Sequence, residues 1–147
     1  FPESPMEVMT PPSAADPTLD GMEAAGSKLI VFHGVSDPVF SFKDTANWYA
    51  RLMENNAAAS DFVRLYAIPG MPHGQGGNAP DEVDMLGALI AWVEDGAAPG
   101  PLTARIRQGN EEADTGNLGA TRPLCPWPRH AQFTGNDPMS AASFSCE

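Results

Sequence analysis

The sequence lacks the features of a membrane-spanning protein and of a nucleic-acid-binding protein. None of its apolar runs approaches the roughly 20 residues that a membrane-spanning helix needs. Basic residues are scarce, because 8 Lys and Arg stand against 19 Asp and Glu and give a net charge of −11. Binding to nucleic acid or to an anionic membrane surface requires a basic face. We therefore expect neither nucleic acid nor a membrane as a partner.

Cysteine and histidine, the usual ligands of zinc, are rare as well. The two cysteines, Cys125 and Cys146, lie too far apart for a CxxC pair, and the three histidines show no zinc-ligand spacing, so we expect no metal site in this chain. The cysteines could be inert buried thiols. Because their Pro-rich, polar surroundings offer little apolar core, we favour a disulfide. It would close a loop of about 22 residues, stabilise the fold by roughly 3 kcal/mol and imply an oxidising compartment.

Proline and glycine are plentiful, with 15 and 14 residues, and they are concentrated toward the two ends. Residues 1–26 are predicted to be an irregular, Pro-rich lead-in with a short helix near residues 18–25. Residues 27–107 are predicted to hold the core, and residues 108–147 to be an irregular tail closed by the disulfide. The chain begins at Phe1, without an initiator Met or a signal-peptide pattern. We therefore expect it to be a piece of a larger protein.

The central part alternates between strand and helix patterns. The continuous apolar run from Leu29 to Phe32 is typical of a strand buried on both faces. A second strand is predicted over residues 61–68, and residues 102–107 are predicted to form a short edge strand. Helices are predicted from a Ser41 cap to residue 55 and from an Asn78 cap to a stop at residue 96. The order strand, helix, strand, helix predicts an α/β fold in which helices cover parallel strands.

Each predicted helix carries an apolar stripe at helical spacing, which indicates a face packed on the sheet. The stripe of the first helix consists of Phe42, Thr45, Trp48, Tyr49, Leu52 and Met53. The stripe of the second consists of Met85, Leu86, Leu89, Ile90 and Val93. Both are predicted to belong to the core.

An acid follows the first strand and a histidine follows the second: Asp37 and His73. Ligand-binding and catalytic side chains gather at the carboxyl ends of parallel strands, so the two are expected to meet there. A carboxylate that accepts a hydrogen bond from an imidazole fixes the ring's tautomer for work as a base. Their order matches the last two members of an α/β-hydrolase triad, but no G-x-S-x-G occurs, and the nearest match, Gly34-Val35-Ser36, has no closing glycine. The nucleophile would have to come from chain before Phe1.

Plainer roles are open for the same residues. Asp37 could cap the following helix or form a turn, as Asp before Pro commonly does. His73 could be an ordinary loop histidine. His33, at the end of the first strand, is interpreted as structural, orienting the loop beneath the site. His130 lies in the tail and has no evident partner.

At the level of whole segments, the chain resembles a known family. KLIVFHGVSDPVFS and RLYAIPGMPHGQGG, followed by TRPLCPWP and DPMSAASFSC, are similar to the C-terminal part of tannases and feruloyl esterases. The resemblance covers roughly residues 15–146. Many hydrolases, including prolyl-oligopeptidase-like enzymes, share the strand and HGxxDP turn, whereas the PGMxH loop joined to this tail is more selective.

The resemblance implies the C-terminal portion of an α/β-hydrolase fold and a secreted serine esterase acting on galloyl- or feruloyl-type aromatic esters. By position, Asp37 matches the family's triad acid, His73 its triad histidine, and Cys125 and Cys146 a structural disulfide. The family's lid, with its calcium site, would lie outside this chain, so no cofactor is expected here. Many relatives have a cysteine after the triad histidine, bonded to one beside the serine. Gly74 stands there instead, which puts in doubt how rigidly His73 is held.

Three functional hypotheses follow. In the first, the chain supplies the acid and histidine of an aromatic ester hydrolase, depends on a missing part that bears the serine, and is inactive by itself. In the second, it is a non-catalytic remnant of a hydrolase that acts as a binding module. In the third, it is part of a serine peptidase of the same fold. Two strands taken from a larger sheet would leave an unpaired edge and uncovered apolar surface, so the isolated chain is expected to aggregate, dimerise or bind the missing part.

Overall fold

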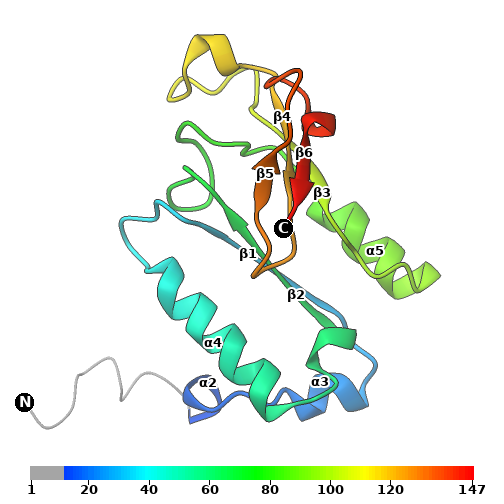
Figure 1. The fold of residues 1–147 in the computed structure, drawn as a ribbon. Helices are drawn as coiled ribbons and strands as arrows, with labels where there is room; N and C mark the ends of the chain where they lie inside the picture. The colour runs from blue at the N-terminus through cyan, green and yellow to red at the C-terminus, as the bar shows by residue number, and fades with distance from the viewer. Residues whose placement is uncertain (1–11) are drawn as a thin grey trace, which may run out of the picture.

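The structure, a computed structural model, describes residues 12–147, and the first eleven residues of the predicted lead-in lie outside the described residues (Figure 1). A central parallel pair of strands lies between two helices, and the tail forms small antiparallel sheets beside them. In chain order, the helices and strands are α2 (Pro12–Ala15), α3 (Asp20–Ala24), β1 (Leu29–Gly34), α4 (Phe42–Asn55), β2 (Val63–Ile68), α5 (Met85–Asp95), β3 (Leu102–Arg105), β4 (Thr121–Leu124), β5 (Ala131–Phe133) and β6 (Phe144–Cys146). Short 3-10 turns span Ala59–Asp61, Thr115–Asn117 and Ala141–Ser143.

Strands β1 and β2 are parallel, in a register that runs from Leu29 opposite Val63 to Gly34 opposite Ile68. Successive side chains of a strand point to opposite faces. Val31 accordingly packs in the cluster beneath α4, whereas Ile30 packs in the cluster on the α5 side. Side chains pack on both faces of the pair, but burial on both faces, predicted for the first strand, is found only in β2. In β1 only Gly34 is fully buried, and Phe32 is 47% exposed, because no described element covers that strand's outer edge. The prediction of parallel strands with covering helices is confirmed.

Helix α4 packs as its apolar stripe predicted. Tyr49 and Leu52 are buried against β1 and β2, and Phe42, Trp48 and Met53 pack partly against the same cluster. The helix begins directly after Ser41 and ends at Asn55, the two predicted boundaries. Ser41 holds the predicted cap position, although its side chain makes no capping hydrogen bond.

The predicted start of α5 is wrong. The helix begins at Met85, and its cap is Asp84, whose carboxylate accepts a hydrogen bond from the Gly87 N–H at 2.7 Å. The residues predicted to form its first turn have partners elsewhere in the chain. Asp81 binds Arg107, and the backbone of Glu82 pairs with that of Arg105. These long-range contacts hold the segment extended and outweigh its local helix signals.

The stripe predicted for the buried face of α5 is also largely wrong. Leu86, Ile90 and Val93 are each at least 46% exposed, and the buried side chain is Trp92. The Trp92 ring is covered by the cationic groups of Lys28 and Arg64, at 5.4 and 4.9 Å from its centroid. Burying the larger ring rotates the helix, so an apolar face is left uncovered by any described residue.

The tail is more regular than predicted. The expected edge strand forms as β3, but its partner is β4, from the segment predicted to be irregular. Further along, β5 and β6 form an antiparallel pair. Each of these strands is three or four residues long. A period-2 pattern cannot be recognised over so few residues, and the pairings join segments that are distant in sequence.

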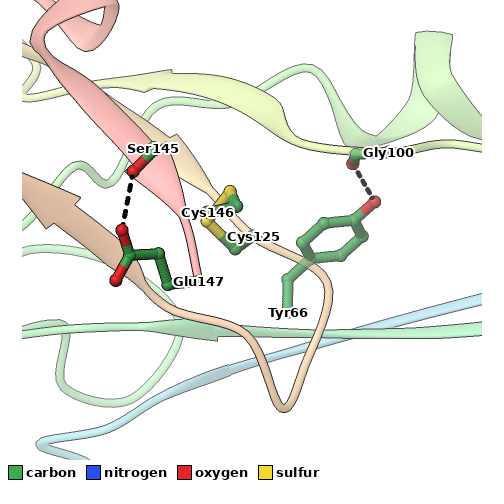
Figure 2. Close-up of a disulfide and its surroundings, with 6 residues drawn as sticks. All are labelled: Tyr66, Gly100, Cys125, Ser145, Cys146 and Glu147. Carbon is green, nitrogen blue, oxygen red and sulfur yellow. Dashed lines mark hydrogen bonds between the residues drawn. A yellow bond between two sulfur atoms is a disulfide. The ribbon is translucent and has the colours of Figure 1, made fainter.

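The tail also covers the outer edge of β2. The Trp127 N–H donates to the Leu65 carbonyl oxygen at 2.8 Å, and Pro126 forms a bridge with Tyr66. The hydroxyl of the buried Tyr66 donates to the Gly100 carbonyl at 2.7 Å (Figure 2). No described strand pairs with the outer edge of β1. None of the described helices is long and apolar enough to cross a membrane.

Cys125 and Cys146 form the predicted disulfide, which joins the end of β4 to β6 with a Cα–Cα distance of 5.7 Å (Figure 2). Replacing both cysteines by serine in the full-length protein is expected to cost about 3 kcal/mol, the entropy that a cross-link of this loop length removes from the unfolded chain. Urea denaturation, followed by circular dichroism, should show a lower midpoint for the double variant. Ser145→Ala, a small change beside the bridge, is the matched control and should keep the normal midpoint. A double variant that unfolds at the normal midpoint would contradict a stabilising role for the bridge.

Candidate active site

The loops that follow β1 and β2 are in direct backbone contact. The Val35 N–H donates to the Ile68 carbonyl and the Ser36 N–H to the Met71 carbonyl, both at 3.0 Å. A Cβ atom at Gly34 would overlap the carbonyl oxygens of Met71 and Pro72, so only glycine fits at the end of β1. This close approach brings the two predicted site residues to the same edge of the sheet.

Asp37 and His73 form a hydrogen-bonded pair, with 2.8 Å between Oδ2 of Asp37 and Nδ1 of His73. The Asp37 side chain is only 4% exposed, whereas that of His73 is 61% exposed. An ionised carboxylate can only accept hydrogen bonds, so Nδ1 carries the proton and the neutral ring presents the lone pair of Nε2. No described residue is hydrogen-bonded to this Nε2. The pair therefore has the arrangement of a base and the acid that orients it.

The other oxygen of Asp37 is bound by its own loop. Oδ1 accepts hydrogen bonds from the Val39 N–H at 2.7 Å and the Phe40 N–H at 3.0 Å. Burial of the carboxyl raises its pKa, but the hydrogen bonds from Phe40, His73 and Val39 outweigh that effect and hold the pKa well below its ordinary value. Asp37 thus forms the local turn that the sequence left open as an alternative, and it binds His73 as well.

His33 lies under this turn, as the sequence predicted. Its Nδ1 is 2.8 Å from Oγ1 of Thr45 in α4, and its Nε2 is 3.2 Å from the Phe40 carbonyl oxygen. The same Nε2 is 3.4 Å from Oδ2 of Asp37. Both ring nitrogens face protein partners, so His33 supports the turn. His130 is exposed in the tail, away from the pair, where its backbone bonds that of Glu147.

An open hollow of about 590 Å³ lies beside the pair. Val31, Phe32 and Trp48 give it apolar walls, and Asp37 and His73 lie at its edge. Phe40 also lines it: this exposed ring has its centroid 5.5 Å from that of His73. Phe40 was not predicted from the sequence, because one phenylalanine in a turn resembles any core residue. Its position three residues after the acid was the available signal.

The described residues provide neither a nucleophile nor a metal centre. No serine, threonine or cysteine among them is hydrogen-bonded to His73. No group of three or more His, Cys, Asp or Glu in the described part of the chain could hold a metal ion. The chemistry that the described residues support is proton transfer at Nε2 of His73.

A family model described as "Tannase and feruloyl esterase" matches residues 3–147. The chain belongs to this family. Among curated proteins it is 43% identical over 122 residues to mono(2-hydroxyethyl) terephthalate hydrolase of Piscinibacter sakaiensis, covering 82% of this chain and 20% of that protein. It is 33% identical over 141 residues to a probable feruloyl esterase B of Aspergillus niger, covering 83% of this chain and 26% of that protein. The chain thus spans about a fifth to a quarter of the length of these relatives.

Solved structures of the tannase and feruloyl esterase family share the fold. The crystal structure of feruloyl esterase B from Aspergillus oryzae superposes with a TM-score of 0.77 at 20% sequence identity. The match covers 88% of this chain and 28% of that one. This likeness confirms the prediction of a fold of the α/β-hydrolase type.

Proposed function

We propose that this chain is the C-terminal part of a secreted serine ester hydrolase that acts on aromatic esters, and that Asp37 and His73 are two members of its catalytic triad. The observation that carries the proposal is the 2.8 Å bond between the buried carboxylate and the exposed imidazole, with Nε2 unengaged by any described residue. Membership of the tannase and feruloyl esterase family supports the reaction class. The disulfide supports an oxidising, extracellular location.

In the proposed reaction, the nucleophilic serine comes from chain outside this sequence. Nε2 of His73 takes the serine proton as the hydroxyl attacks the ester carbonyl, and then gives it to the leaving alcohol. In the second half, Nε2 takes a proton from the water that attacks the acyl-enzyme and returns it to the serine oxygen as the carboxylic acid leaves. Asp37 stabilises the imidazolium formed in both halves and keeps the ring oriented. The family's calcium site is expected in a lid outside this chain.

The proposal of an aromatic substrate rests on the hollow and on the relatives. Phe40, beside His73, offers an exposed ring on which an aromatic acyl group can pack. The matched relatives are named for terephthalate and feruloyl substrates, which share an aromatic acid. The shared chemistry is an ester of an aromatic carboxylic acid.

The direct test compares the full-length protein with the isolated chain on methyl gallate. The full-length protein is expected to hydrolyse the ester, and the isolated chain to show no turnover. The gene upstream of Phe1 should encode a G-x-S-x-G segment. Absence of that segment, together with an inactive full-length protein, would favour the non-catalytic remnant. Cleavage of peptides in preference to methyl gallate would favour the peptidase.

A further inference from the structure

The loop that presents His73 has unusual backbone freedom. Gly74, Gly76 and Gly77 follow the histidine, with φ angles of 83°, 88° and 70°. Glycine populates such conformations easily, but it also loses the most conformational freedom when it is ordered. The His73 ring is mostly exposed and, among the described residues, is hydrogen-bonded to Asp37 only. The orientation of the His73 ring therefore depends on the contacts that hold the loop backbone before and after the histidine.

Before the histidine the loop is held by packing, because Met71 is buried and its carbonyl accepts the Ser36 N–H. After the histidine it is held by Asp81. Oδ2 of Asp81 accepts the Gly76 N–H at 3.2 Å. The Asp81 side chain is 0% exposed, so this carboxylate cannot exchange the contact for water.

The Asp81 carboxylate is fixed in turn by Arg107, which follows β3. Nε and Nη2 of Arg107 lie 3.2 and 2.9 Å from Oδ2, and the Arg107 backbone N–H donates to Oδ1 at 3.3 Å. Burial raises the pKa of Asp81, but its hydrogen bonds with Arg107 and with the Gly76 N–H outweigh that effect. The net pKa is below its ordinary value, so the carboxyl stays ionised. An ionised, buried carboxylate with these partners gives the loop a rigid anchor.

A second set of contacts fixes the next residue of the loop. The Asn110 side-chain amide donates to the Gly77 carbonyl at 2.8 Å, and the Gly77 N–H donates to Glu112 at 2.5 Å. Next in the chain, the amide of Asn78 donates to Asp114 at 2.9 Å. The first part of the predicted irregular tail, residues 108–114, thus binds the segment that carries the histidine.

We propose that Asp81 and Arg107 are positioning residues for His73: through the Gly76 N–H they hold the loop so that Nδ1 stays on Asp37. This inference rests on the proposed esterase function. Neither residue touches the reacting atoms, so they act by keeping the base aligned. Loss of alignment should reduce turnover and leave substrate binding unchanged.

The test is Asp81→Asn in the full-length protein, assayed on methyl gallate well below its unfolding temperature. The amide removes the charge that binds Arg107, and kcat is expected to fall by up to about 100-fold with KM unchanged. Glu82→Gln is the matched control. It removes the neighbouring carboxylate, which is exposed, 3.9 Å from Arg105 and outside the loop network, and kcat should be unchanged.

Arg107→Gln gives a second, milder test. Arg107 is only partly buried, and its loss still leaves the hydrogen bond from the Gly76 N–H to the Asp81 carboxylate. It should lower kcat by a smaller factor, and the effects of the two substitutions should not add when they are combined. If Asp81→Asn fails to fold, this variant carries the test. A lower melting temperature with normal kcat, or a raised KM with normal kcat, would overturn the inference. An inactive unmutated protein would overturn the proposed function itself.

Discussion

Replacing His73 by alanine in the full-length protein is expected to abolish hydrolysis of methyl gallate, with kcat reduced by about 10⁴- to 10⁶-fold. The ring is the only described group placed to receive the serine proton beside the hollow, and alanine offers no replacement base. Because the side chain is mostly exposed, its removal leaves no cavity in the core, and the variant should fold normally. Single-turnover and steady-state assays on the same preparation would measure the loss.

His130→Ala is the matched control for that experiment. It removes an exposed histidine from the tail, away from the Asp37–His73 pair, and should leave kcat and KM unchanged. Circular dichroism of the two variants should be the same as that of the unmutated protein. A His73→Ala protein that hydrolyses the ester at the normal rate would rule out His73 as the base.

Asp37→Asn is expected to reduce kcat by about 10⁴-fold. The amide oxygen can still accept the Val39 and Phe40 N–H groups, so the turn should persist. If its NH₂ group faces His73, however, it favours the tautomer in which Nε2 carries the proton. That ring cannot act as a base toward serine. The neutral amide also fails to stabilise the imidazolium that forms during the reaction.

The pH dependence of the Asp37→Asn effect follows from the lowered pKa of Asp37. A carboxyl whose pKa is lower in the folded than in the unfolded state stabilises the fold above its unfolded pKa, and this contribution is lost as the pH falls through the folded value. Asp37 therefore stays charged across neutral and mildly acidic pH. Protonation of Asp37 should therefore not reduce the activity of the unmutated protein between about pH 8 and pH 5, which a pH profile of kcat would check. Asp95→Asn is the matched control: it changes an exposed carboxylate at the end of α5 and should have normal activity. A fully active Asp37→Asn protein would contradict the triad assignment.

The sequence was sufficient to predict the central strands and the meeting of Asp37 with His73. Both strands are apolar on two faces, and in a parallel pair the loops after them must leave at the same edge. Helix α4 was equally predictable from the sequence, since its apolar repeat extends over its whole length. In each case, local pattern and tertiary packing favour the same structure.

The errors arose where a distant residue determined the local structure. Asp81 and Glu82 look like the first turn of a helix, but their partners Arg107 and Arg105 lie more than twenty positions away. Likewise, β4 was missed because it is defined by its pairing with β3, and no local pattern indicates that pairing. Trp92 replaced the predicted stripe of α5 as the buried residue because Lys28 and Arg64, from other segments, cover its ring.

The two edges of the central strand pair differ in a way that limits how copies of the isolated chain can associate. The Pro126–Trp127 crossing binds the Leu65 carbonyl and bridges to Tyr66 on the outer edge of β2, whereas no described strand pairs with the outer edge of β1. Two copies can therefore join β1 to β1, and the resulting four-stranded sheet then ends in a covered strand on each side. In such a pair the Pro126–Trp127 crossing would lie along both outer edges, where it would oppose the addition of a further strand.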